Sequence, residues 1–179
     1  MNKYINHFIT IIRHKWYVFV ECCKMGIPLR GITHDLSKFS PAEFISSARY
    51  FQGNRSPIEA ERETVGYSYA YCHHKGKNRH HWQYWLDTVG TDENGAIRLV
   101  PLPVPEKYVK EMYCDMVGAA RAYGGLTTAE SYYLSKRHEM LFHPETKAKL
   151  EKLLGAEPAD NGPAFSPAPI RNNAKETCL

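Results

Sequence analysis

Helix start signals recur at short intervals along this chain. Ser40-Pro41-Ala42-Glu43, Ser56-Pro57-Ile58-Glu59 and Thr127-Thr128-Ala129-Glu130 each place a hydroxyl side chain just before a helical pattern. Such a side chain caps the free N–H groups of a first turn, and a proline fits the first helical position of two of the three. Glycines follow most of the segments that these signals open. The pattern predicts a series of helices, and therefore an all-α fold.

The expected elements fill most of the chain. We expect helices over 6–25, 41–51, 57–74, 78–86, 105–123, 128 onward and 144–155, with a short turn or helix opening at Thr33 or His34. Asn94-Gly95 lies between short β-prone runs, which predicts a small hairpin or irregular insertion near residues 88–103. The result is a single-domain helical bundle over residues 1–155. The Pro/Ala-rich residues 156–179 are expected to form a flexible tail.

Composition narrows the classes of function. A chain of 179 residues is long enough for one domain with a proper core, and its net charge of +4 suits an anionic ligand such as a nucleotide. That charge is well below the basic excess of a dedicated nucleic-acid-binding protein. The five cysteines include no C-x-x-C pair, which is typical of a protein of the reducing cytosol. Charged residues interrupt the apolar stretch 9–20, so we expect a cytoplasmic protein without a signal peptide or membrane span.

Histidines and aspartates are the candidate functional residues. His34-Asp35 precedes Leu36-Ser37-Lys38, and two histidine pairs follow at 73–74 and 80–81. Imidazole is the commonest metal ligand in proteins, and a carboxylate adds a hard oxygen donor. His14 lies in the first helix, where His7, two turns earlier, is its rival. Asp115 lies in an apolar helix, where it needs either a metal or an ion pair with Arg121 or Lys110.

These residues carry a resemblance. Their order, with His14 first, His34-Asp35 next, then His74, His80-His81 and Asp115, resembles the signature of the HD-domain superfamily of metal-dependent phosphohydrolases. His-Asp-Leu-Ser-Lys is similar to the family's HD-x-G-K turn, with Ser37 in place of the usual glycine. More narrowly, HDLSKFSPAEF and KNRHHWQYW resemble segments of an uncharacterised family of small bacterial and phage HD-like proteins. The resemblance covers roughly residues 6–123.

The resemblance implies an HD-like helical bundle around one or two divalent ions, which could be Mn, Fe, Co, Ni, Mg or Zn. The implied metal ligands are His14, His34, Asp35, His74, His80, His81 and Asp115. The first site takes His14, His34, Asp35 and Asp115, and the other three histidines complete a second site that shares Asp35. Lys38 is expected to neutralise a phosphate, although a solvated surface lysine is the alternative. Glu111 or Glu43 is expected to orient the attacking water. Alternatively, Glu111 accepts a hydrogen bond from one of the metal ligands.

The expected function is therefore hydrolysis of a nucleotide or another small phosphate ester by metal-activated water. Two alternatives stay open from the residues alone. An HD-type di-iron oxygenase would use the same scaffold for oxygen chemistry. A non-enzymatic binding module would use the metal only for stability. Among the other candidates, Trp82, Tyr84 and Trp85 are expected in the core, and His138 and His143 at the surface or in a cap.

Overall fold

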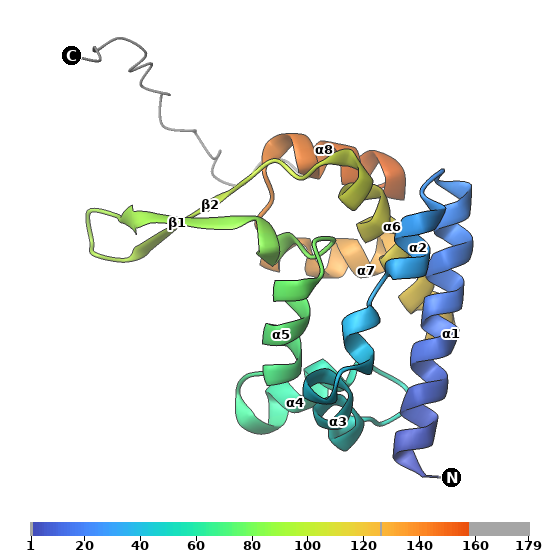
Figure 1. The fold of residues 1–179 in the computed structure, drawn as a ribbon. Coiled ribbons are helices and arrows are strands. Elements are labelled where there is room, and N and C mark those ends of the chain that lie inside the picture. Colours follow the sequence, from blue (N-terminus) through green and yellow to red (C-terminus); the bar gives the residue numbers. More distant parts are fainter. Residues whose placement is uncertain (1, 126, 158–179) are drawn as a thin grey trace, which may run out of the picture.

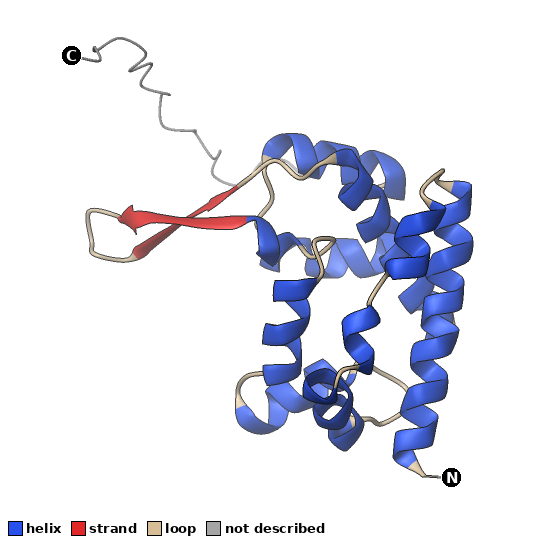
Figure 2. Ribbon diagram, in the orientation of Figure 1, coloured by secondary structure: helices blue, strands red, loops and turns tan. Residues whose placement is uncertain are grey.

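A computed structural model describes residues 2–125 and 127–157. These residues form eight α-helices and one antiparallel hairpin, which confirms the predicted fold class (Figures 1 and 2). The helices are α1 (Lys3–Lys24), α2 (Pro28–Thr33), α3 (Pro41–Tyr50), α4 (Pro57–Val65), α5 (Tyr69–Lys77), α6 (Glu106–Ala122), α7 (Ala129–Lys136) and α8 (Pro144–Leu154). Single 3₁₀ turns lie at η1 (Leu36–Phe39), η2 (Trp82–Trp85) and η3 (Arg137–Glu139).

The hairpin consists of β1 (Leu86–Thr91) and β2 (Ile97–Pro101), and it projects from the helices (Figure 2). Leu86 pairs with Pro101, and the register shifts between Thr88 and Thr91. Most of its side chains are exposed. The hairpin therefore adds little to the core, and the helices position the functional residues.

Helices α1 and α6 pack closely against each other. At the crossing, Gly118 of α6 lies against Val18 of α1, and a Cβ added at Gly118 would stand 2.4 Å from Val18 Cγ2. Only a residue without a side chain fits there. His14 lies one turn before Val18, and Asp115 lies one turn before Gly118. The close approach therefore brings His14 and Asp115 to the same part of the interface.

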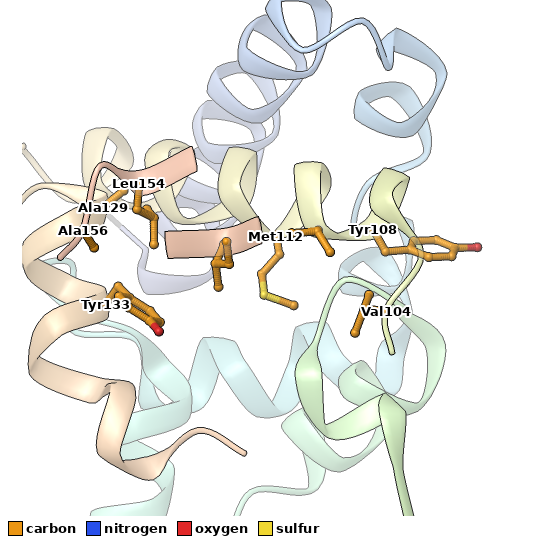
Figure 3. Close-up of a cluster of buried hydrophobic side chains, with 9 residues drawn as sticks. Val104, Tyr108, Met112, Ala129, Tyr133, Leu154 and Ala156 are labelled. Atoms are coloured by element: carbon orange, nitrogen blue, oxygen red, sulfur yellow. The ribbon is translucent and has the colours of Figure 1, made fainter. Parts of the chain in front are cut away.

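An apolar cluster lies where α6, α7 and α8 meet (Figure 3). Its buried members are Val104, Tyr108, Val109, Met112, Ala129, Tyr133, Leu150, Leu154 and Ala156. Trp82 and Trp85 pack against it, as the sequence predicts, whereas Tyr84 is 38% exposed. The hydroxyl of Tyr133 donates to Glu151 Oε1 at 2.9 Å, so the polar end of this buried ring is satisfied. Tyr108, Val109 and Met112 anchor the N-terminal half of α6 in this cluster, and the same helix carries the candidate site residues Glu111 and Asp115.

Three boundaries differ from the sequence-based expectation. The helix expected over 57–74 is two helices, because Gly66 adopts a left-handed conformation (φ 84°) and the Ser68 side chain caps α5 by accepting from Tyr71 N. The helix expected over 78–86 is only the turn η2, since Leu86 already pairs in the hairpin. Helix α2 was not expected, although Pro28 stands at its first position.

The C-terminal helix α8 ends at Leu154, and Gly155 caps it in a left-handed conformation (φ 68°). The predicted flexible tail over 156–179 lies, except for its first two residues, outside the described residues. No helix within residues 2–125 and 127–157 has the length and apolar character needed to cross a membrane.

Candidate metal centre

The His34-Asp35 turn has an unusual backbone. His34 follows α2 in an extended conformation, and Asp35 is left-handed, with φ 52° and ψ 29°. Among the described residues other than glycine, Asp35 alone has a positive φ. Aspartate tolerates this region better than most residues, but the conformation still carries strain. The reversal lets two consecutive side chains turn inward, and both are buried.

A first group of ligand atoms comes from α1, the His34-Asp35 turn and α6. The Nε2 atom of His14 lies 3.1 Å from Asp115 Oδ1 and 3.4 Å from His34 Nε2. The Nε2 atom of His34 lies 3.2 Å from Asp35 Oδ2 and 3.4 Å from Asp115 Oδ1. Ligand atoms bound to one ion at about 2.1 Å, at angles between octahedral and tetrahedral, stand roughly 3.0–3.4 Å apart. These four distances therefore match the spacing of a single coordination shell, and the contact of His14 Nε2 with Asp35 Oδ2 is longer, at 3.7 Å.

A second group surrounds the other oxygen of Asp35. Its Oδ1 atom lies 3.3 Å from His80 Nε2 and 3.4 Å from His74 Nε2. One ligand atom from each of Asp35, His74, His80 and His81 falls within 4.8 Å of the others. Asp35 thus presents Oδ2 to the first group and Oδ1 to the second, which is the arrangement of a carboxylate between two cation positions.

The donor atoms have few other partners. Within the described part of the chain, Asp35 Oδ1 and the Nε2 atoms of His80 and His81 form no hydrogen bond, although all three are buried. Buried polar atoms without partners are costly, and natural proteins rarely leave several together. A divalent cation in the second group would satisfy all three at once. The residues therefore fit a metal ion, and the imidazole and carboxylate donors suit Mn, Fe, Co, Ni or Zn.

The charges of the two ligand groups also favour a cation. Burial alone would raise the pKa of Asp35, but the charges of His34 and Lys38 outweigh it and hold that pKa well below its usual range. Burial likewise opposes ionisation of Asp115, and hydrogen bonds from His14 and His34 reverse the effect on its pKa. Both carboxylates are therefore ionised at neutral pH. The buried charge of Asp35 and the partly exposed charge of Asp115, which face unpaired donor atoms, attract a positive ion.

Two further carboxylates lie behind the histidines. Glu111 Oε1 accepts a hydrogen bond from His34 Nδ1 at 3.1 Å, and Glu43 Oε2 accepts one from His74 Nδ1 at 2.8 Å. A carboxylate on Nδ1 fixes the tautomer of the ring, so that Nε2 faces the metal. Burial opposes ionisation of Glu111, but contacts with His34 and His80 lower its pKa to about 2.

Comparison with known proteins identifies the family. A model of DUF5662, a family of unknown function, matches residues 3–156. The chain belongs to DUF5662. Neither the search of curated proteins nor that of solved structures gives a match. Every residue of the cluster lies inside the span matched by the DUF5662 model.

The structure settles where the other sequence-based candidates of this DUF5662 chain lie. His7, the rival of His14, packs against Phe44 and Phe51 and has no place in either group. His74 joins the second group, whereas His73 is half-buried and contacts Glu43 Oε1 at 2.7 Å. His143 caps α8, and His138 is exposed.

Asp115 does not form the alternative ion pair with Arg121 or Lys110. Arg121 pairs with Glu21 at 2.5 Å, and Lys110 pairs with Glu106 at 2.8 Å. The basic partner of Asp115 is instead imidazole, from His14 and His34. Lys38 also contacts the metal centre, since its Nζ atom lies 2.6 Å from Asp35 Oδ2.

Three site residues were not expected from the sequence. Arg30 forms an ion pair with Glu111, and Ser37 and Asn78 contact the second group. Asn78 Nδ2 donates to Ser37 Oγ at 2.7 Å, and Ser37 Oγ lies 3.4 Å from His74 Nδ1. Only their proximity in sequence to His34 and His80 could have pointed to them, because arginine, serine and asparagine carry no metal-ligand signal.

Glu43 has a different role from the one that its sequence context indicates. Ser40 caps α3, since its side chain accepts from Glu43 N, but the Glu43 carboxylate turns to His73 and His74 instead of returning to the Ser40 backbone. Both Glu43 and Glu111 therefore face Nδ1 atoms, on the side of the rings away from the shared cluster. This arrangement favours orientation of ligands over orientation of a water molecule.

Proposed function

We propose that this DUF5662 chain is an HD-like, metal-dependent phosphohydrolase whose substrate is a nucleotide or another small phosphate ester. One observation carries the proposal: Asp35 faces a His/Asp group with each of its two oxygens. The order of the residues along the chain, which resembles the HD signature, adds to it. Many enzymes that displace a leaving group from phosphorus bind two adjacent metal ions.

A divalent ion bound there would lower the pKa of a coordinated water and polarise a phosphoryl oxygen. The ligands are mostly buried, but 21% of the Asp115 side chain and 27% of the Lys38 side chain are exposed. Solvent therefore reaches the centre beside these two residues. A catalytic metal site needs such an open side, whereas a purely structural site is closed.

Lys38 is the residue suited to binding a phosphate oxygen. Its side chain is partly exposed, and the Asp35 carboxylate holds the ammonium in place at 2.6 Å. Burial opposes its charge, but Asp35 and Asp115 raise the pKa of Lys38 above its ordinary value. A fixed positive charge beside the reacting phosphoryl group stabilises the charge that develops in the transition state.

The test is a screen of phosphomonoesters, phosphodiesters and nucleotides, with manganese, iron, cobalt, nickel or magnesium added to chelator-treated protein. We expect metal-dependent release of phosphate or nucleoside. Lys38→Ala should keep its metal and lose on the order of 10²–10³ in rate. Lys136→Ala is the matched control, because Lys136 also pairs with a carboxylate, Glu139, at 2.9 Å but lies on α7. Its rate should equal that of the wild type.

Two results would contradict the proposal. Metal-loaded wild type that turns over none of these substrates, yet consumes oxygen with a small organic substrate, would indicate the di-iron oxygenase. Metal-loaded protein that is inactive in both assays, but melts at a lower temperature when stripped of metal, would indicate the binding module.

A further inference from the structure

Glu111 lies behind both ligand groups at once. Its Oε1 atom accepts from His34 Nδ1 at 3.1 Å and lies 3.3 Å from His80 Nδ1, without forming a hydrogen bond to the latter. His34 belongs to the first group and His80 to the second. The two rings also lie against each other, with centroids 4.5 Å apart and their planes tilted by 37°. A single buried oxygen therefore faces the rear of one histidine from each cation position.

Arg30 holds the other oxygen of Glu111. Its Nε and Nη2 atoms lie 2.7 Å and 2.6 Å from Oε2, and the guanidinium group stacks on the Tyr108 ring at 4.7 Å. The planar guanidinium fork and the aromatic face leave the arginine few other orientations. Because two donors grip one end of the carboxylate, the other end is held toward His34 and His80.

His34, His80 and Glu111 are themselves close enough together to contact one ion. The guanidinium group makes this a poor cation position, because a positive charge already lies 2.6 Å from the carboxylate. The function of Glu111 is therefore exerted through the Nδ1 atoms, and the Nε2 atoms remain for the metal.

We propose that Arg30 and Glu111 form a clamp that couples the two cation positions, so that an ion in one increases the affinity of the other. An ion on His34 Nε2 requires His34 to donate from Nδ1, which removes the freedom that Arg30 leaves to the Oε1 end of Glu111. The fixed Oε1 atom then orients His80 before the second ion arrives, so less freedom is lost on binding it. Arg30 touches no ligand atom and acts as a positioning residue.

The inference rests on the metal centre of the proposed function, and not on hydrolysis. The experiment is a titration of chelator-stripped, full-length protein with CoCl₂, followed by visible absorption and by calorimetry. We expect the wild type to bind two Co²⁺ per chain in one cooperative transition. In Arg30→Ala, binding should resolve into two steps, with the second affinity lower by about 10–100-fold, the range for loss of a group behind a metal ligand.

Arg30→Lys covers the case in which Arg30→Ala does not fold, since it keeps the positive charge but not the fork. We expect two resolved steps for it as well. Arg121→Ala is the matched control, because Arg121 pairs with the buried Glu21 of α1, whose ion-pair partners among the described residues are Arg121 and Lys24 and include no histidine. It should bind Co²⁺ as the wild type does, even if its urea midpoint falls.

Wild-type cooperativity in both Arg30 variants would overturn the clamp. So would an equal loss in Arg121→Ala, because the effect would then be one of general stability. Either result leaves phosphohydrolase activity of the wild type untouched. Conversely, cooperative binding of two ions by a protein that hydrolyses nothing would support the clamp and contradict the proposed function.

Discussion

Replacing Gly118 by alanine should push α1 away from α6 and disturb the centre that lies between them. The new Cβ would stand 2.4 Å from Val18 Cγ2 and 3.0 Å from Val18 N. Ordinary contact between carbon atoms is about 3.5–4.0 Å, so the helices must separate by roughly 1 Å. A rotamer change of Val18 can relieve the first overlap but not the second, because the second involves the backbone.

The magnitude follows from two opposing effects. Overpacking of this kind costs about 1–3 kcal/mol of folding free energy, and alanine regains about 1 kcal/mol over glycine within a helix. Because the new Cβ meets the backbone of Val18, which cannot move aside, we take the upper end of the overpacking cost. The expected net loss in folding free energy is about 2 kcal/mol. The separation would also move His14 away from Asp115 Oδ1, now 3.1 Å apart. We therefore expect affinity for the first metal ion to fall on the order of 10–100-fold.

Urea denaturation of chelator-treated protein measures the stability change, and titration with CoCl₂ measures the affinity. Gly76→Ala is the matched control, since Gly76 lies in α5 and a Cβ there meets nothing within 4 Å. It should stabilise the protein by up to about 1 kcal/mol. Gly118→Ala protein with unchanged stability and metal affinity would refute the account of the α1–α6 contact.

Three further predictions concern single side chains. Asp35→Ala should reduce bound metal from two ions per chain to none, because both groups lose their shared oxygen donor, as elemental analysis would measure. Glu43→Gln should weaken the second metal ion by about 10–100-fold and spare the first, in a calorimetric titration. Burial, reinforced by Lys38, lowers the pKa of His7 to about 4. Unfolded protein binds the proton more readily, so stability should fall by roughly 3 kcal/mol between pH 7 and pH 4, as urea midpoints would show.

Each of these predictions has a control. Asp35→Ala protein that retains both ions would place the metal elsewhere. Glu63→Gln removes a carboxylate from an exposed pair with Arg55 and should leave metal binding unchanged. If it lowers the affinity for the second metal ion as much as Glu43→Gln does, Glu43 does not act by orienting His74. His7→Leu should reduce the loss of stability on acidification, and an identical pH profile would show that His7 does not contribute.

The sequence predicts the helices best where local chemistry decides their ends. Pro41 and Pro144 stand at the first helical positions of α3 and α8, and Gly155 caps α8, as expected. The break at Gly66 was missed because glycine within a helical pattern is tolerated, and only the Ser68 cap makes it a boundary. The hairpin was predictable from Asn94-Gly95, whereas the extent of its strands depends on pairing across the chain.

The candidate site was predictable as a set of residue types but not as a geometry. Sequence order pointed to His14, His34, Asp35 and Asp115, and the fold brings them together. The left-handed backbone of Asp35, which lets the side chains of His34 and Asp35 both turn inward, has no sequence signature. The contact of Arg30 with Glu111 has no sequence signature either, because an ion pair between residues 81 positions apart depends on tertiary packing alone.

The most direct test of the metal centre is anomalous diffraction from crystals of manganese-loaded protein. We expect two peaks, one on each side of the Asp35 carboxylate and about 3.5–4 Å apart. The first should lie among His14, His34 and Asp115, and the second among the histidines at 74, 80 and 81. A single peak would contradict the shared role of Asp35, and the absence of any peak near Asp35 would contradict the metal centre itself.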